Sequence, residues 1–321
     1  MRARLLDLGQ VSAVRSQTLY HAVAECAAPD DRATLCVLRP DRPYVSIGYH
    51  QDAAREIDLA FCRACGLPVI RRRIGGGAVL LDADQLFFHF VAPRARLADL
   101  GLPGRLDRRY ERLVAPAIAA YRRLGVRAEF RPVNDIHVEG RKIGGTGAAD
   151  IGESFVFVGS MMLAFDHALM ARVLRLADEG MREGVRRSIE RFVTSLEEVR
   201  GVRPALEEVH AALLAGFGEA LGLELEPGRL GEAEEARCAE LTARFESEEW
   251  LHRVTWSRTR PRKLAINCAV HYVEGETVDG VRVAVRLLDG RVDDVRVSGG
   301  ATAETPEVIA LTAKLVEAAT A

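Results

Sequence analysis

Three arginines and three glycines stand close together in residues 71–77, Arg-Arg-Arg-Ile-Gly-Gly-Gly. Glycines expose backbone N–H groups without side-chain obstruction, and adjacent guanidinium groups bind phosphate or carboxylate through paired hydrogen bonds. This chemistry suits the phosphates of a nucleotide. A flexible turn beside a solvated run of charge is the alternative that this segment alone leaves open.

A second segment, residues 134–147, combines acidic, basic and glycine residues. Glu139-Gly140 predicts a hairpin turn, which would bring Asp135 and Lys142 together on paired strands. A lysine that rises from a strand into a glycine-lined pocket can stabilise the developing negative charge of a phosphate or acyl oxygen. An ordinary surface lysine on a hairpin is the alternative here.

Both segments lie among predicted strands. Apolar runs bounded by turn residues predict strands at 34–38, 44–47, 68–70, 78–81, 86–91, 135–138, 142–144 and 155–163. Helical periodicity occurs at 18–26 and 106–124, and residues 166–221 are predicted to be mostly helical. Strands that come in clusters, and do not alternate strictly with helices, favour an α+β sheet domain.

The C-terminal residues predict a second, small domain. Alternating apolar residues from Leu264 to Tyr272 predict one half-buried strand. Two further strands are predicted on either side of an Asp289-Gly290 turn, and Thr305-Pro306 predicts the start of a last helix. We expect a catalytic domain over 1–245 and a connector with a small accessory domain over 246–321, with a basic run at 258–263 in the connector.

Composition excludes several classes of protein. The 321 residues include 44 Lys and Arg and 46 Asp and Glu, which gives a net charge of −2. The protein therefore lacks the excess of basic residues that is typical of a general nucleic-acid binder. No apolar run is long enough to span a membrane, and the N-terminus does not read as a signal peptide. We therefore expect a cytoplasmic protein with neither nucleic-acid nor membrane partners. The six cysteines are too sparse for a disulfide framework, and Cys62 and Cys65 are expected to be structural.

The order and spacing of the two segments resemble the lipoate-protein ligase family. The resemblance rests on Val45-Ser-Ile-Gly48, the Arg-Arg-x-x-Gly-Gly-Gly-Ala-Val segment, Asn134-Asp135-Ile136 and Gly140-Arg-Lys142-Ile-Gly-Gly145. It implies a mixed-sheet α+β catalytic domain of the kind shared with biotin ligases and octanoyltransferases, followed by a small α+β accessory domain.

The resemblance also implies a function. A family member would use ATP with Mg²⁺ to convert lipoate to lipoyl-AMP, release pyrophosphate, and transfer the lipoyl group to a lysine of a lipoyl-domain or other lipoate-binding carrier protein. Lys142 would be the catalytic residue, and Asp135 would hold Mg²⁺ with the nucleotide. The implied ATP and lipoate contacts are Arg72, Arg73, Gly75, Gly76, Gly77, Ala78, Asn134, Asp135, Gly145 and Thr146.

Two alternatives remain open. An octanoyl or lipoyl transferase of the same fold would use a cysteine thioester, but neither the segment before Asn134 nor the Lys142 loop contains a cysteine. A non-catalytic lipoate-binding or adenylate-binding subunit or sensor is the other alternative. It is raised by departures from the family pattern at Ile74, at Leu81 and after Thr146, where an expected arginine is missing.

Overall fold

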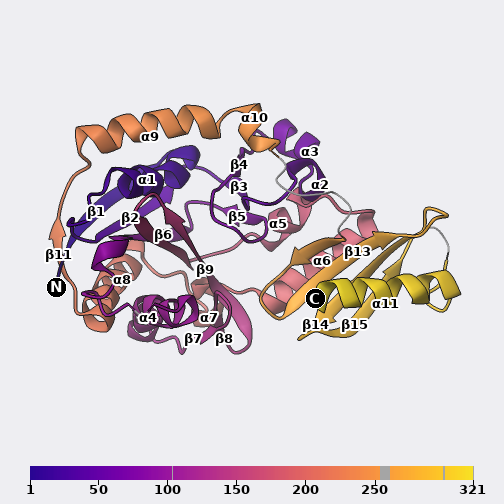
Figure 1. The fold of residues 1–321 in the computed structure, drawn as a ribbon. Helices are drawn as coiled ribbons and strands as arrows, with labels where there is room; N and C mark the ends of the chain where they lie inside the picture. The colour runs from indigo at the N-terminus through magenta and orange to yellow at the C-terminus, as the bar shows by residue number, and fades with distance from the viewer. Residues whose placement is uncertain (103, 254–260, 299–300, 321) are drawn as a thin grey trace.

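The centre of the computed structural model is an eight-stranded mixed sheet with the order β11-β1-β2-β6-β10-β9-β8-β7 (Figure 1). The structure describes residues 1–102, 104–253, 261–298 and 301–320. β1 runs parallel to β2 and β11, and the other neighbouring strands are antiparallel. The strands are β1 (Arg2–Val11), β2 (Thr34–Pro40), β6 (Gln85–Pro93), β7 (Glu129–Arg131), β8 (Asp135–Val138), β9 (Arg141–Ile151), β10 (Ser154–Met162) and β11 (Glu224–Pro227).

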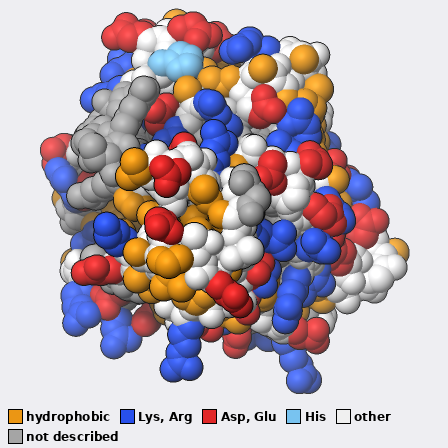
Figure 2. Space-filling model, turned by 90° about the vertical axis from the view of Figure 1, so that its right-hand side faces the viewer, with side chains coloured by type: hydrophobic (Ala, Val, Ile, Leu, Met, Phe, Trp, Pro, Cys, Tyr) orange, Lys and Arg blue, Asp and Glu red, His pale blue; other side chains and the backbone are white. Residues whose placement is uncertain are grey.

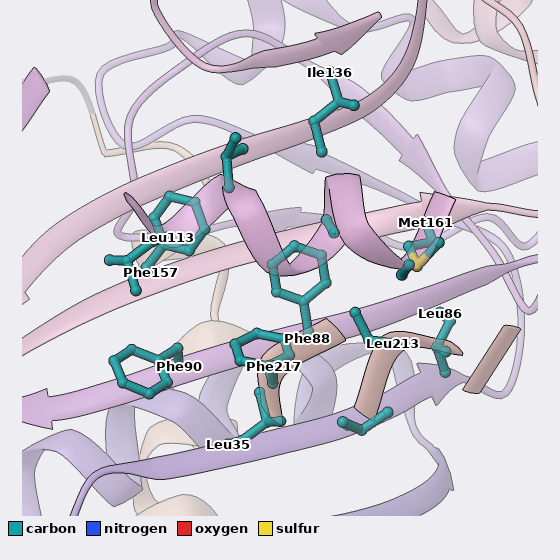
Figure 3. Close-up of a cluster of buried hydrophobic side chains, with 14 of the residues drawn as sticks. Leu35, Leu86, Phe88, Phe90, Leu113, Ile136, Phe157, Met161, Leu213 and Phe217 are labelled. Carbon is teal, nitrogen blue, oxygen red and sulfur yellow. The ribbon is translucent and has the colours of Figure 1, made fainter. Parts of the chain in front are cut away.

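Helices cover both faces of this sheet. One face packs against α4 (Leu106–Arg123) and α8 (Leu206–Leu221), and the other against α1 (Ala13–Cys26) and α9 (Glu232–Phe245). Successive side chains of a strand point to opposite faces, so a strand covered on both sides is apolar throughout. β6 is buried at every position for this reason. Figure 3 shows Phe88 and Phe90 of β6 against Phe217 of α8.

A smaller sheet, with the order β4-β3-β5, holds the glycine-rich segment. Its strands are β3 (Tyr44–Ile47), β4 (Val69–Arg71) and β5 (Val79–Leu81), and residues 72–78 connect the last two. The short helices α2 (Ala53–Glu56) and α3 (Leu59–Ala64) lie between β3 and β4 in the chain. The strands predicted around this segment are confirmed, and the triple glycine forms the loop between two of them.

The chain continues through α5 (His167–Val173), α6 (Glu179–Phe192), α7 (Leu196–Arg200) and, after α8 and α9, α10 (Glu248–Leu251). A four-stranded antiparallel sheet follows, formed by β12 (Arg262–Ala265), β13 (Val270–Glu276), β14 (Arg282–Leu288) and β15 (Arg291–Val297). α11 (Pro306–Thr320) packs on this sheet. The α+β fold class with a C-terminal α+β accessory domain is confirmed, whereas the boundary at residue 245 stays a prediction.

The predicted single strand over 264–272 is wrong. β12 ends at Ala265 and β13 begins at Val270, and the two strands pair as a hairpin. The side chain of Asn267 closes the turn, because its Oδ1 accepts hydrogen bonds from the N–H groups of Ala269 and Val270. Alternation of apolar residues continues through a tight turn, so the sequence pattern does not reveal it. As a result, Cys268 lies at the tip of a hairpin.

The accessory domain is attached to the catalytic domain by a buried ion network. Arg262, which is 5% exposed, donates to the carboxylates of Glu56 in α2 and Glu274 in β13, each at 3.0 Å. Its guanidinium also reaches the backbone carbonyls of Glu56 and Arg175. Most of the predicted basic run falls outside the described residues, but Arg262 and Lys263 belong to β12.

Replacing Arg262 with alanine is expected to destabilise the protein by about 3–5 kcal/mol, because the buried carboxylate of Glu56 and the partly buried carboxylate of Glu274 then lose their cation. Arg282 is the matched control: its side chain is 56% exposed and lies 3.8 Å from Glu276, so Arg282→Ala should cost less than about 1 kcal/mol. Urea unfolding of both variants measures the difference. If both variants lost the same free energy of unfolding, the result would contradict a structural role for the ion network.

The surface mixes charges of both signs. Figure 2 shows Lys and Arg interspersed with Asp and Glu on the face that lies at the right of Figure 1. This distribution agrees with the net charge of −2. No helix in the described part of the chain is long and apolar enough to cross a membrane.

Candidate active site

A pocket of about 390 Å³ brings the two predicted segments together. Residues 74–81 form part of its wall, and β8 and β9 contribute Asp135, Lys142 and residues 145–147. The accessory domain closes a third side with residues 264–268 and His271. Apolar side chains from β6, β10, α5 and α6 also line the pocket, so it is an apolar chamber with polar groups at defined positions.

The glycine loop presents bare backbone to the pocket. Gly76 has φ of +94°, a conformation that side-chain-bearing residues rarely adopt. Gly48 packs beneath it so closely that a Cβ on Gly48 would lie 2.0 Å from the carbonyl oxygen of Gly76. Within the described residues, no acceptor bonds the backbone N–H groups of Gly75, Gly76 or Gly77. These groups are therefore available to an anionic ligand.

Arg72 supports this loop from within. Its Nη2 donates to the carbonyls of Gly75 and Gly77 at 2.8 and 2.7 Å, its Nε to Gly75, and its Nη1 to the carbonyl and hydroxyl of Ser46. All five guanidinium N–H donors are thus occupied. Burial lowers the pKa of Arg72 to about 10, so the group stays charged at neutral pH. In this arrangement Arg72 is a positioning residue that holds the loop carbonyls.

The side chain of Arg73 points in a different direction from that of Arg72. Its guanidinium lies 3.1 Å from Glu25 of α1, and Arg73 is not among the residues that line the pocket. β4 ends at Arg71 and the chain bends at Arg73, so the two guanidinium groups point in different directions. The structure therefore brings Arg72 to the predicted site and turns Arg73 away from it.

Lys142, whose side chain is partly buried, forms an ion pair with the buried carboxylate of Asp135. Glu139 and Gly140 both have positive φ in the predicted hairpin turn, and Lys142 Nζ lies 2.7 Å from Asp135 Oδ1. Burial alone would raise the pKa of Asp135, but Lys142, His137 and a backbone N–H outweigh it and hold that pKa below its usual range. Asp135 is therefore ionised at neutral pH and fixes the lysine cation at the pocket wall.

Hydrogen bonds from side chains to backbone carbonyls fix the neighbouring residues of the pocket wall. Asn134 and Thr146 are locked together: the Asn134 side chain donates to the Thr146 carbonyl at 2.8 Å, and Thr146 Oγ1 donates to the Asn134 carbonyl at 2.8 Å. Gly145 leaves room for the lysine, because a Cβ there would lie 3.2 Å from Lys142 Nζ. Asn134, Gly145, Thr146 and Ala78 all line the pocket.

Cys268 comes to this site from the accessory domain. Its backbone N–H donates to Asp135 Oδ2 at 2.6 Å, and its Sγ lies 3.6 Å from His137 Nε2. Cys268 is separated from Asp135 by more than a hundred residues, so no local motif predicts the contact. Burial, followed by the charge of Asp135, raises the pKa of the Cys268 thiol to about 11. The group is a neutral thiol in this setting.

Residues 16–218 match the lipoyl protein ligase A/B catalytic domain family, which covers both predicted segments. The chain belongs to this family. An octanoyltransferase LipM from Kyrpidia tusciae is 30% identical over 275 residues, which cover 78% of this chain and 98% of the relative. The expectation of a lipoate-protein ligase family member is thereby confirmed.

Solved structures agree with this assignment. A structure described as a bipartite lipoate protein ligase and its E2 lipoyl domain, from Thermoplasma acidophilum, superposes with a TM-score of 0.72 at 26% identity, covering 81% of this chain and 99% of the other. Lipoate-protein ligase A bound with ATP superposes with a TM-score of 0.67 at 25% identity, covering 78% and 99%. The protein is thus similar both to ligases and to octanoyltransferases.

Asp135 does not suit Mg²⁺. Mg²⁺ prefers an octahedral shell of oxygen ligands, and both oxygens of Asp135 are engaged by Lys142 and by the Cys268 N–H. Among the described residues, the His, Cys, Asp and Glu side chains that cluster with Asp135 are His137 and Cys268, whose nitrogen and sulfur are poor magnesium ligands. No step at this site is therefore assigned to a metal held by Asp135.

Proposed function

We propose that the protein is an ATP-dependent ligase that joins a lipoyl-type acid to a lysine of an acceptor protein. The glycine loop carries this proposal, because its N–H groups at Gly75, Gly76 and Gly77 have no acceptor among the described residues and border the same pocket as Lys142. Backbone N–H groups arranged in this way bind the phosphates of a nucleoside triphosphate. A transferase that takes its acyl group from a thioester has no triphosphate to bind.

The chemistry follows from that arrangement. A carboxylate oxygen of the acid attacks the α-phosphorus of ATP, the bond to the β-phosphate bridging oxygen breaks, and pyrophosphate leaves. The neutral amine of the acceptor lysine then attacks the carbonyl carbon of the mixed anhydride; the acyl C–O bond breaks, AMP leaves, and the amine proton passes to solvent. Lys142 stabilises charge on the shared oxygens, and the loop N–H groups position the phosphates. Mg²⁺ enters with ATP as its counter-ion. The similarity to a ligase described with an E2 lipoyl domain supports a lipoyl domain as the acceptor.

Octanoyl or lipoyl transfer without ATP is the second candidate function. The name of the 30% identical relative, octanoyltransferase, favours it, as does Cys268 beside Lys142 and His137. In such a reaction Cys268 Sγ would bond to the acyl carbon as the carrier C–S bond breaks. The thiol proton would pass through His137 Nε2 to the leaving thiolate. The raised pKa of Cys268 weighs against this route, because the thiolate is the nucleophile.

One experiment separates these functions. The purified chain is incubated with a lipoyl domain that lacks its lipoyl group, and with either ATP, Mg²⁺ and lipoate or octanoyl carrier protein without ATP. Intact mass and pyrophosphate release are measured. We expect lipoylation and pyrophosphate together in the first mixture. Acylation only in the second mixture would establish the transferase. Lipoate binding without either product would indicate a non-catalytic subunit or sensor.

Replacing Cys268 with serine is expected to change ATP-dependent lipoylation by less than about threefold, because the ligase reaction needs no side-chain nucleophile. Serine keeps the backbone N–H that bonds Asp135 and nearly keeps the side-chain volume. A loss of 10²-fold or more with unchanged melting temperature would instead assign the thiol to catalysis, since covalent catalysis depends on the nucleophile itself.

A further inference from the structure

Three different metal-binding side chains meet where the accessory domain touches the catalytic domain. Asp135 and His137 come from β8, and Cys268 comes from the tip of the hairpin formed by β12 and β13. Their ligand atoms, which are an oxygen, a nitrogen and a sulfur, all lie within 4.8 Å of one another. Within the described residues this is the one group of three His, Cys, Asp or Glu side chains that converges so closely. The ATP-dependent reaction uses neither His137 nor Cys268 and does not explain the convergence.

The separations of the ligand atoms suit a tetrahedral zinc site. Cys268 Sγ lies 3.6 Å from His137 Nε2, and His137 Nε2 lies 3.7 Å from Asp135 Oδ2. Zinc bonds of about 2.3 Å to sulfur and about 2.0 Å to nitrogen or oxygen place two ligand atoms of a tetrahedral site about 3.3–3.6 Å apart. Both pairs therefore need to move by no more than a few tenths of an ångström to bind one zinc ion.

β8 directs two of the ligands toward the hairpin tip. Alternate residues of a strand share a face, so Asp135 and His137 point to one side while Ile136 packs in the hydrophobic core on the other. His137 is 0% exposed and Asp135 is 1% exposed, so both side chains are held in place by their surroundings. Cys268 is only partly buried and lines the pocket, as Asp135 does. A metal ion can thus enter from the pocket, and water from the pocket can supply a fourth ligand.

The charges at the cluster also suit zinc. Zinc displaces the thiol proton of Cys268 to solvent, and the resulting thiolate and the Asp135 carboxylate balance the two charges of the ion. Lys142 can stay in place, because it contacts Oδ1 of Asp135 at 2.7 Å and zinc would bind Oδ2. Oδ2 also accepts the backbone N–H of Cys268 at 2.6 Å, the kind of hydrogen bond that supports a ligating carboxylate. Nitrogen and sulfur, which are unsuitable for Mg²⁺, are preferred zinc ligands.

We propose that Asp135, His137 and Cys268 form a zinc site that joins the accessory domain to the catalytic domain beside Lys142. Two ligands come from β8 and the third from the hairpin between β12 and β13, so the bound ion fixes the hairpin tip against β8. The site is independent of the proposed function, because zinc binding requires neither ATP nor an acyl substrate.

Titration of the reduced full-length chain with Co²⁺ tests the ligand set. Co²⁺ replaces zinc in such sites, and a cobalt–thiolate bond gives a charge-transfer absorption band in the near ultraviolet. We expect this band to appear and to saturate at one ion per chain. Added Zn²⁺ should abolish the band, because zinc binds nitrogen and sulfur ligands more tightly than cobalt does. A titration in which no such band appears would overturn the proposal.

Cys268→Ser and Cys65→Ser identify the thiol that binds the metal. Cys65 is exposed, lies outside the cluster and belongs to the Cys62-x-x-Cys65 pair, so Cys65→Ser is the matched control. We expect Cys268→Ser to lose the cobalt band and to weaken zinc binding, measured by calorimetry, about tenfold or more, since even the loss of a group that only supports a ligand costs that much. Cys65→Ser should keep both. A band that persists in Cys268→Ser, or that disappears in Cys65→Ser, would overturn the proposal.

His137→Gln tests the contribution of the catalytic domain to the site. A metal ion that binds only the folded state raises the melting temperature. We expect Zn²⁺ to raise the melting temperature of the unsubstituted chain and of Cys65→Ser, but of neither His137→Gln nor Cys268→Ser. An equal increase for His137→Gln and the unsubstituted chain would overturn the bridging role, because the ion would then be held without the imidazole of β8.

Discussion

Replacement of Lys142 by alanine is expected to reduce adenylate formation by about 10²–10³, the scale for the loss of one preorganised group that stabilises charge. The lysine is held 2.7 Å from Asp135 at the pocket wall, so it needs no reorganisation when negative charge develops on the substrate. Pyrophosphate release with saturating ATP and lipoate, in a single turnover, measures the effect. A change below threefold would remove Lys142 from the mechanism.

The control for this variant must preserve the fold. Lys142→Ala leaves the carboxylate of Asp135, which is 1% exposed, without its cation, and such uncompensated buried charge is strongly destabilising. The double variant with Lys142→Met and Asp135→Asn removes both charges at nearly constant volume. It should recover the melting temperature but not the activity. Recovery of both would show that the loss in Lys142→Ala reflects folding and not chemistry.

Replacement of Gly76 by valine is expected to reduce ATP-dependent activity by at least about 10²-fold, because the loop N–H groups lose their positions. A β-branched residue strongly disfavours φ of +94°, so the loop must rearrange. A Cβ on Gly76 would also lie 3.0 Å from Arg72 Nη2, the group that holds the loop carbonyls. ATP-dependent pyrophosphate release measures the loss, and circular dichroism verifies the fold.

Gly66→Val is the matched control for backbone strain. Gly66 follows α3, is exposed, has φ of +63° and does not line the pocket. A Cβ on Gly66 would meet no described atom within 4 Å. Gly66→Val should lower the free energy of unfolding by about as much as Gly76→Val, about 1–2 kcal/mol, while activity is retained. If Gly76→Val were as active as Gly66→Val, the glycine loop would not be the phosphate cradle.

Local patterns predicted the elements around the site well. The turn at Glu139-Gly140 brought Asp135 and Lys142 close together as expected: Lys142 pairs with His137, and Asp135 lies two residues before His137 in the same strand. The glycine loop between β4 and β5 was likewise predictable from consecutive glycines between apolar runs. The strand predicted over 264–272 failed because the hairpin turn inside it is made by a single side chain, Asn267.

The sequence by itself determined the α+β class, the glycine loop and the Lys142 hairpin, since each depends on residues close together in the chain. Only the tertiary structure decided the roles of Arg72 and Arg73, because one guanidinium is used by the loop carbonyls and the other by Glu25. It also decided that Cys268 shares the pocket with Lys142. Such contacts join distant segments through sheet pairing and domain docking, which no local periodicity encodes.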